Sequence, residues 1–319
     1  MPFLDDLRKF GPDASPEVSR AEAWAYCARL TATHYENFSV VTWLTPRPLR
    51  PAFQSIYAFC RWSDDLGDEV GDPARSRELL AWWRGELRAI ERGRARHPVM
   101  IALAETIEEF AIPFEPFEAL ISAFEQDQTV TDYATFPQLL DYCTRSADPV
   151  GHLVLYLGRA FDPENARLSD LTCSALQLAN FWQDVSRDLA IGRVYLPRED
   201  RERFGYPDAD LFARRFTREF AALLEFEVGR ARDMLERGRA LIPRIPRALA
   251  VDVDLFSRGG LAILDRIETQ GFDVFRSRPK LSKLTKVGLL ARAVLGGARA
   301  VRARGPEVVE GAIRPGMGS

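Results

Sequence analysis

The sequence predicts an all-α protein. Apolar residues recur at intervals of three and four over long windows, as at Phe53, Ile56, Tyr57 and Cys60, and this spacing places them on one face of a helix. Strict alternation over strand-length runs is scarce, which argues against a sheet. The expected helices lie near residues 19–32, 36–44, 49–69, 73–93, 98–111, 114–127, 136–158, 166–188, 214–240, 244–274 and 282–303.

Proline clusters separate these helices in chain order. The first cluster, at residues 46–51, divides the second helix from the third. Pro113 and Pro116 divide the fifth from the sixth, and Pro243 and Pro246 divide the ninth from the tenth. Each cluster marks a connection or a helix start, because proline cannot continue a helix. No shift in composition marks a domain boundary, so we expect one domain over 1–319, with a core at about 20–280 and a terminal helix and tail at about 281–319.

Composition and charge limit the classes of function. The chain has 319 residues, of which 46% are hydrophobic and 28% are charged, as in an ordinary globular protein. A chain of this length buries about three quarters of its unfolded surface, so its core can enclose a long apolar ligand. The 43 Lys and Arg nearly balance 46 Asp and Glu, for a net charge of −3. This balance argues against a nucleic-acid partner, because such proteins usually carry a basic excess.

The four cysteines and the N-terminus bear on location. Cys27, Cys60, Cys143 and Cys173 form no CxxC pair and lie in apolar helical windows, so we expect buried free thiols rather than disulfides or a zinc site. The first residues, MPFLDDLRKF, are charged and lack the apolar region of an export signal. No apolar run is long enough to span a membrane. A cytoplasmic protein is therefore expected.

The most apolar late stretch leaves two interpretations open. The stretch 281–301 is interrupted by Lys283, Lys286, Arg292 and Arg299. It is either a terminal helix packed on the domain or a helix that lies on a membrane surface. The second interpretation would place the protein peripherally at the inner face of the membrane.

A first acidic stripe lies in the segment SIYAFCRWSDDLGDE. Asp64 and Asp68 are four residues apart and share one face of the predicted helix. Tyr57 and Arg61 lie on the same side. Because like charges one turn apart repel each other, a positive group or ion is expected nearby.

A second stripe lies in the segment CSALQLANFWQDVSRD. Gln177, Asn180, Asp184 and Asp188 are spaced three, four and four residues apart, and their neighbours on the helix are apolar. A polar line among apolar residues is expected to face an enclosed space, where carboxylates need a partner or a cation. Oxygen ligands of this type suit Mg²⁺, which takes one or two carboxylates together with phosphate oxygens.

Two acidic stripes indicate a binding site more strongly than one stripe does. A single pair of aspartates four residues apart is usually a solvated face, but here two pairs stand about 120 residues apart, each among apolar and aromatic residues. If the two helices face each other, the carboxylates form a cage that is open to a diphosphate. Arg61 and Arg193 would then hold phosphate oxygens as guanidinium forks. Arg193 fits equally well as an ordinary loop charge.

These segments resemble a known family. YAFCRWSDDLGDE and QLANFWQDVSRDLAIGRVYLP look like the two signatures of the squalene and phytoene synthase family, in the right order and separation. The resemblance covers residues 20–280 approximately. It implies an isoprenoid synthase fold with one helical domain around a central apolar cavity. It also implies prenyl diphosphate substrates and two or three Mg²⁺ ions held between the acidic helices.

Within that family, the chain is similar to bacterial hydroxysqualene synthases of the HpnC type. The passages HYENFSVVTWLTPRPLRP, YCTRSADPVGHLVLYL and NFWQDVSRDLAIGRVYLPRED carry this likeness. Members that join two prenyl diphosphates usually carry arginine where Gln183 stands and often lysine where Glu36 stands. They also usually carry a Gly-containing stretch where this chain has Ser146-Ala147-Asp148-Pro149. The loss of cationic groups fits a protein that handles one diphosphate, although Gln183 is also consistent with ordinary packing against a neighbouring helix.

The resemblance implies roles for individual residues. Asp64, Asp68, Asp184 and Asp188 would bind Mg²⁺ and act in catalysis, with Asn180 as a further oxygen ligand. Tyr57 would join them as a catalytic residue at the diphosphate end, beside Arg61 and Gln177, while Phe38, Tyr142, Val150 and Gly151 would line the hydrocarbon cavity. Phe38 and Tyr142 are also consistent with core aromatics, and Gly151 with a helix–helix contact.

The implied chemistry begins with the cleavage of a carbon–oxygen bond to diphosphate, and a carbocation remains. In the HpnC-type reaction, presqualene diphosphate ionises and rearranges, and water captures the cation to give hydroxysqualene in squalene or hopanoid biosynthesis. This carbon–oxygen lyase reaction needs no NADPH.

Other functions remain open. The main alternative is a prenyltransferase that joins two prenyl diphosphates into presqualene diphosphate, squalene or phytoene. A non-catalytic helical assembly protein is a remote alternative. A handover of apolar product to other enzymes of the pathway is also conceivable from the chemistry. Among the histidines, we expect His34 and His152 to be packed and His97 to lie at the surface beside a turn.

Overall fold

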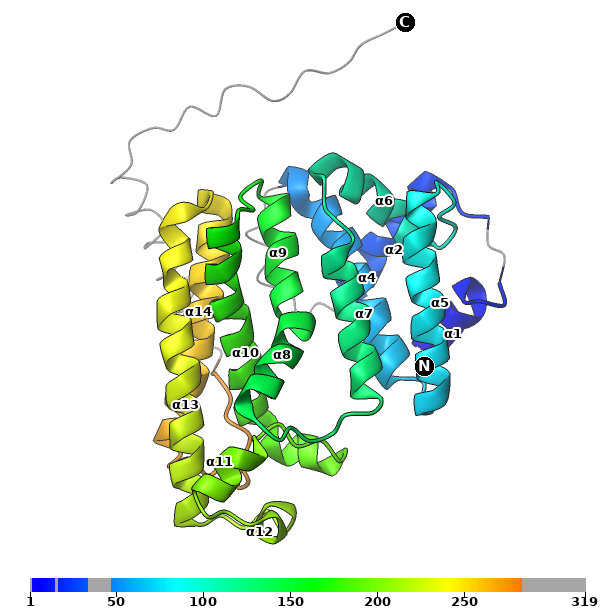
Figure 1. Ribbon diagram of the computed structural model, residues 1–319. Coiled ribbons are helices and arrows are strands. Elements are labelled where there is room, and N and C mark those ends of the chain that lie inside the picture. Colours follow the sequence, from blue (N-terminus) through cyan, green and yellow to red (C-terminus); the bar gives the residue numbers. More distant parts are fainter. Residues whose placement is uncertain (1, 15–16, 34–46, 283–319) are drawn as a thin grey trace, which may run out of the picture.

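The computed structural model describes residues 2–14, 17–33 and 47–282. Its long helices lie side by side with roughly parallel axes, from α5 and α4 at one edge through α7, α9 and α10 to α13 and α14 at the other (Figure 1). The described residues contain one isolated bridge, between Asp132 and Val194, and no strand. The predicted all-α class is therefore confirmed, while the helices expected at 36–44 and 282–303 lie outside the described residues.

Most predicted helices are present within a few residues of their expected bounds. The described helices are α1 Pro2–Phe10, α2 Arg20–Thr33, α4 Arg50–Asp68, α5 Pro73–Glu91, α6 Pro98–Phe110, α7 Glu115–Asp127, α8 Phe136–Ser146, α9 Asp148–Leu157, α10 Pro163–Ala190, α11 Arg198–Arg203, α12 Asp208–Phe212, α13 Arg218–Gly238 and α14 Arg247–Thr269, with 3₁₀ turns η1 Arg47–Leu49 and η2 Arg239–Arg244. The short helices α1, α11 and α12 were not predicted, because each has too few residues for an apolar period to stand out.

The prediction of a single helix over residues 136–158 is wrong. The chain forms α8 and α9, which are separated at Ala147, where φ is −123° and ψ is −50°. Pro149 explains the break, because it has no backbone N–H to donate and its ring clashes with the carbonyl of the preceding turn. The break redirects the chain so that α9 starts at Asp148.

Helix α10 is the central element and extends over 28 residues. Its N-terminus is capped: the carboxylate of Asp162 accepts a hydrogen bond of 2.8 Å from the backbone N–H of Asn165, and Pro163 occupies the first turn. It packs against α9, α13 and α14. Its long apolar face buries residues such as Leu178 and Trp182, and this packing fixes the orientation of the polar line on the same helix.

His97 is buried rather than at the surface, which corrects the expectation. It is 1% exposed and packs edge-on against Trp62 and Trp83, at centroid distances of 4.4 and 4.8 Å. Its Nδ1 accepts a hydrogen bond of 3.2 Å from the N–H of Val99, so His97 caps α6. Burial lowers the pKa of His97 to about 3, which keeps the ring neutral in the folded protein.

The four cysteines form no disulfide, as predicted. Cys27 and Cys143 are buried, while Cys60 and Cys173 are partly buried. None of the described helices is long and apolar enough to cross a membrane.

Two glycines of α13 give a matched test of the packing against α10. A Cβ on Gly238 would stand 2.3 Å from Thr172 Oγ1 and 3.0 Å from the Thr172 backbone nitrogen, whereas a Cβ on Gly229 would meet nothing within 4 Å. Gly238→Ala should destabilise the fold by about 1–3 kcal/mol through overpacking. Gly229→Ala should stabilise it by up to about 1 kcal/mol through helix propensity. Chemical denaturation of both variants measures this contrast, and equal effects would contradict the tight contact.

Candidate active site

The two acidic stripes lie at corresponding places on their helices. Asp64 and Asp68 occupy the last turns of α4, and Asp184 and Asp188 occupy the last turns of α10. The C-terminus of a helix carries a partial negative charge, so carboxylates at these positions meet both one another and the helix dipole. Each stripe therefore requires a cationic partner, and the structure supplies arginines.

Arg61 holds the first stripe. Its Nε donates to Asp65 Oδ2 at 3.0 Å, a second nitrogen contacts Asp65 Oδ1, and a third lies 3.2 Å from Asp64. Asp65 is 3% exposed, so it serves as the buried partner of Arg61. Asp64 and Asp68 remain directed toward open space, because their side chains are 43% and 52% exposed.

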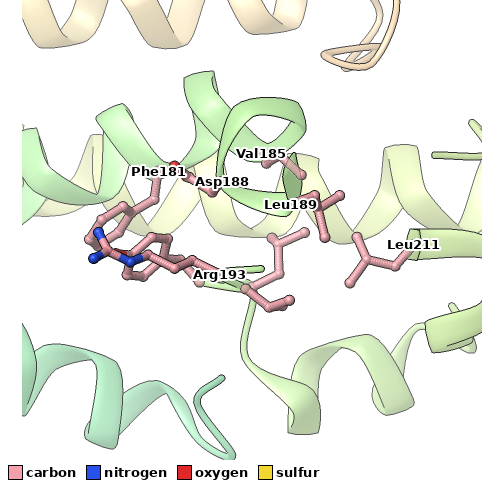
Figure 2. Close-up of a pocket in the computed structure, with 9 residues that line it drawn as sticks. Phe181, Val185, Asp188, Leu189, Arg193 and Leu211 are labelled. Carbon is pink, nitrogen blue, oxygen red and sulfur yellow. The ribbon is translucent and has the colours of Figure 1, made fainter. Parts of the chain in front are cut away.

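Arg193 connects the two stripes. It lies in the loop after α10, and its guanidinium contacts Asp68 of α4 at 3.3 Å. Figure 2 shows it beside Phe181 and Asp188 of α10. Burial opposes the charge of Arg193, but Tyr195, Asp127 and Asp68 outweigh it and raise the pKa of the guanidinium. Arg193 therefore lies within the site, while its role in holding phosphate oxygens stays a prediction.

Arg278 forms an ion pair with Asp184 of the second stripe. Its Nε contacts Asp184 Oδ1 and its NH2 donates to Asp184 Oδ2 at 2.7 Å. The same NH2 donates to Gln183 Oε1 at 3.2 Å, and the Gln183 amide donates to the carbonyl of Pro279. Gln183 thus anchors the segment after α14, and that segment brings the Arg278 guanidinium beside Asp184. The role of Gln183 in binding substrate stays a prediction.

Three acidic groups of the site, Asp64, Asp127 and Asp188, have raised pKa values. Burial, together with Asp68, raises the pKa of Asp64 to about 6, with Arg61 opposing. Burial and Asp184 raise the pKa of Asp188 to about 7. Asp127, at the end of α7, also has a pKa of about 6 because of burial, although Arg193 and the hydroxyl of Tyr142 oppose the rise. Partial burial therefore makes the charged forms of these three carboxyl groups costly.

A hard cation fits this donor set. The carboxylates offer only oxygen, and the side chains of Asp64 and Asp68 are 43% and 52% exposed, so they are open to a ligand. Within the described residues, no three acidic, histidine or cysteine side chains converge to hold an ion unaided. Such a site suits Mg²⁺, which takes few protein carboxylates and completes its shell with water and phosphate oxygens.

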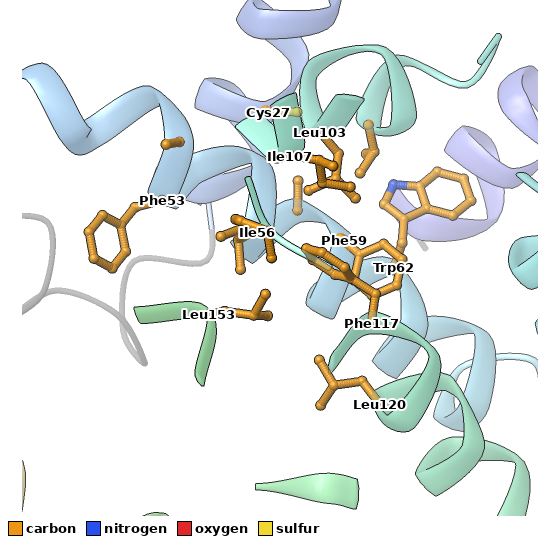
Figure 3. Close-up of a cluster of buried hydrophobic side chains, with 14 of the residues drawn as sticks. Cys27, Phe53, Ile56, Phe59, Trp62, Leu103, Ile107, Phe117, Leu120 and Leu153 are labelled. Carbon is orange, nitrogen blue, oxygen red and sulfur yellow. The ribbon is translucent and has the colours of Figure 1, made fainter. Parts of the chain in front are cut away.

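An apolar cavity of about 450 Å³ opens beside the first stripe. Tyr57, Arg61 and Asp64 of α4 line it, and apolar side chains of α4, α9, α10, η2 and α14 form most of its remaining wall. Figure 3 shows two of these side chains, Phe53 and Ile56, where the wall continues into the buried aromatic core. The cavity therefore has a charged end and a long apolar interior.

Val150 and Gly151 line this cavity, as predicted. A Cβ on Gly151 would stand 2.2 Å from Ser169 Oγ and 2.7 Å from Cys173 Sγ. Gly151 thus also permits α9 to approach α10 closely, so both interpretations of this glycine hold.

Other predicted residues lie elsewhere. Tyr142 is not among the described lining residues of the cavity; its hydroxyl donates to Asp127 at 2.9 Å, beside the charged end. Gln177 is half-buried and Asn180 is exposed on the face of α10 that carries Asp184. Phe38 lies outside the described residues.

Sequence reasoning missed Asp127, Arg278 and Asp252. Asp127 and Arg278 come from segments without a periodic acidic or basic pattern, and only the fold brings them to the site. Asp252 lines the cavity from α14. A lone acidic residue between Val251 and Val253 was the only signal for it in the sequence.

The structure combines an all-α fold with an apolar cavity and a group of carboxylates and arginines at one end of it. The family model for squalene/phytoene synthase matches residues 31–285. The chain therefore belongs to the squalene/phytoene synthase family, whose members act on prenyl diphosphates. This confirms the resemblance drawn from the two acidic signatures.

Individual relatives agree with this assignment. The chain is 33% identical to 15-cis-phytoene synthase from Synechocystis sp. over 287 residues, which is 85% of this chain and 84% of the relative. The crystal structure of squalene synthase HpnC from Alicyclobacillus acidocaldarius is 47% identical, with a TM-score of 0.77 over 81% of this chain and 97% of that one. A dehydrosqualene synthase structure shares the fold at 24% identity, with a TM-score of 0.79 over 88% of this chain and 98% of that one.

The raised pKa of Asp188 predicts a pH-dependent stability. A carboxyl whose folded pKa exceeds its unfolded value stabilises the fold while protonated, and this contribution is lost as pH rises from about 4 to about 7. In a divalent-free buffer, the free energy of unfolding of Asp188→Asn minus that of wild type should be about 2 kcal/mol larger at pH 8 than at pH 5. Denaturant unfolding at both pH values measures the difference. Glu236→Gln, on the exposed face of α13, is the control, and an equal pH dependence of both variants would contradict the burial of Asp188.

Proposed function

We propose that this chain converts presqualene diphosphate to hydroxysqualene. The observation that carries the proposal is the cavity of about 450 Å³, whose wall is mostly apolar, with Tyr57, Arg61 and Asp64 at one end. That division matches a ligand with a long hydrocarbon body and a single diphosphate. The 47% identity to the protein described as squalene synthase HpnC supports a substrate of this class.

The proposed reaction uses Mg²⁺ held by Asp64 and Asp68 on one helix and Asp184 and Asp188 on the other, with Asn180 as a further oxygen donor. When bound, the ion neutralises charge on the departing diphosphate as a Lewis acid. Arg193 contacts Asp68, and nearby groups raise its pKa, so its guanidinium stays charged. It can therefore hold diphosphate oxygens through paired hydrogen bonds. Tyr57 and Arg61 stand where the diphosphate end meets the cavity.

The cleavage step breaks the carbon–oxygen bond, and its electron pair leaves with diphosphate. A carbocation remains in the cavity, where apolar side chains such as Phe53 and Leu153 exclude bulk water. Addition of one water molecule and loss of one proton give the alcohol. The reaction therefore consumes no reductant, and NADPH is not part of the proposal.

A second candidate is the joining of two prenyl diphosphates. Arg278 favours it, because this residue brings a guanidinium to Gln183 and Asp184 and so supplies charge at the place where condensing relatives are expected to carry arginine. The relative from Synechocystis sp. is described as a phytoene synthase. Against this candidate, the Arg278 fork is already paired with Asp184, which leaves it less free to hold a second diphosphate.

The two candidates predict different products. With presqualene diphosphate, Mg²⁺ and no NADPH, the main product should be an alcohol whose oxygen derives from ¹⁸O-labelled water, because solvent captures the cation. Farnesyl diphosphate should give little presqualene diphosphate. Mass spectrometry of the extracted lipids measures both results. Rapid condensation of farnesyl diphosphate, or squalene formed only with NADPH, would move the chain to the condensing function.

The carboxylate cage predicts a loss of activity without a loss of fold. Asp64→Asn or Asp184→Asn should lower turnover by about 10²-fold or more, because each removes a negative oxygen from the ion and leaves diphosphate charge uncompensated. Helix content should be unchanged by circular dichroism, and relief of like-charge repulsion should preserve or raise stability. Glu236→Gln again serves as the surface control. Near-normal turnover of either variant at limiting Mg²⁺ would show that the cage is wrong.

A further inference from the structure

Asp252 is a buried carboxyl group in the wall of the apolar cavity. It lies on α14, is 5% exposed, and lines the cavity together with Leu249 and Val253. Its Oδ1 has no hydrogen-bond partner, and no described residue forms an ion pair with it. A carboxyl group in this position is costly unless a polar molecule satisfies it.

A neighbour on the same helix shows that this arrangement is specific. Asp254 is equally buried, at 5% exposed, and its Oδ1 also accepts no hydrogen bond, but its carboxylate forms ion pairs with Arg239 at 2.9 Å and with Arg258 at 2.7 Å. Residues two apart on a helix point to different sides. Asp254 is therefore held by arginines, whereas Asp252 is directed at the cavity.

The cavity offers Asp252 few polar groups of its own. Across from α14, the hydroxyl of Thr172 donates to the carbonyl of Leu168, within its own helix. Ser169 contacts the sulfur of Cys173 at 3.9 Å. On α14 itself, the lining residues around Asp252 are Leu249, Val253 and Phe256, which offer no polar side-chain atom. The cavity has room for a water molecule beside the carboxylate, because one water takes about 30 Å³.

The acid–base state of Asp252 suits such a partner. Burial alone raises the pKa of Asp252 to about 7. A group that titrates near neutral pH can accept a proton and release it again. Arg61 and Asp64, the charged lining residues on α4, lie at the diphosphate end, where Arg61 is paired with Asp65 and Asp64.

We propose that Asp252 holds the water molecule that captures the carbocation and accepts its proton. In this step, a lone pair of the water oxygen forms the new carbon–oxygen bond, and one O–H bond of that water breaks. The proton passes to the Asp252 carboxylate, which becomes a carboxylic acid and later returns the proton to solvent or to the released diphosphate. The inference rests on the proposed conversion of presqualene diphosphate to an alcohol. It adds a catalytic residue on the wall of the hydrocarbon cavity, apart from the carboxylates of α4 and α10.

The test separates diphosphate release from alcohol formation. Asp252→Asn retains the size of the side chain but removes the base. It should keep diphosphate release within about threefold of wild type and lower the fraction of product that is alcohol by about tenfold or more, with hydrocarbons formed by proton loss in its place. Asp252→Glu should restore part of the alcohol fraction. Diphosphate release is measured by a coupled phosphate assay, and the products from presqualene diphosphate in ¹⁸O-labelled water are measured by mass spectrometry.

Asp254→Asn is the matched control, because it also removes a buried carboxylate from α14 but breaks only arginine contacts. It should lower the melting temperature and leave the alcohol fraction unchanged. If wild type makes the labelled alcohol and Asp252→Asn makes the same fraction, the role of Asp252 is overturned and the proposed function stands. If wild type makes no alcohol, the proposed function fails and the role of Asp252 fails with it. Should Asp252→Asn not fold, Asp252→Ser takes its place, because it also removes the carboxylate: a lowered alcohol fraction supports the role, and an unchanged fraction overturns it.

Discussion

Like charge at two helix ends is the constraint on which the site depends. Asp64 and Asp68 end α4, and Asp184 and Asp188 stand in the last turns of α10, so each pair meets the negative end of a helix dipole. Arg61, Arg193 and Arg278 offset this charge from three different segments. Burial still raises the pKa values of Asp64 and Asp188, because it disfavours their charged forms. Carboxylates placed together at two helix ends repel one another, and binding of a cation with a diphosphate would relieve that repulsion.

The rest of the fold keeps this charge separate from a large apolar space. The long helices bury aromatic and aliphatic side chains around the cavity, and Gly151 lets α9 approach α10 without an intervening side chain. Charged groups of the motif helices are confined to one end of the cavity. This division allows a hydrocarbon to be enclosed while its leaving group remains in a polar setting. Asp252 departs from the division, and an uncompensated carboxyl in an apolar wall indicates a role in chemistry rather than in stability.

Parts of the site were predictable and parts were not. The motif aspartates could be assigned because a spacing of four residues places them on one face whatever the tertiary structure. Arg193 was ambiguous in sequence, since a loop arginine carries no periodic pattern, and only its contact with Asp68 decides its place. Arg278 follows Gln183 by 95 residues, so no local pattern could connect them. Tyr142 was assigned to the cavity, yet the break at Ala147 and the packing of α8 place its hydroxyl on Asp127.

The sequence by itself determined the helical class, most helix bounds, the two acidic stripes and the family. Those features depend on interactions within three or four residues of the chain or on motifs that are contiguous. Tertiary structure alone decided which arginine neutralises which carboxylate, that His97 is buried, and that Asp252 faces a cavity while Asp254 meets two arginines. The physical reason is that burial and charge pairing depend on which helix faces lie opposite each other. That choice is made by the packing of distant segments and leaves no periodic mark on either of them.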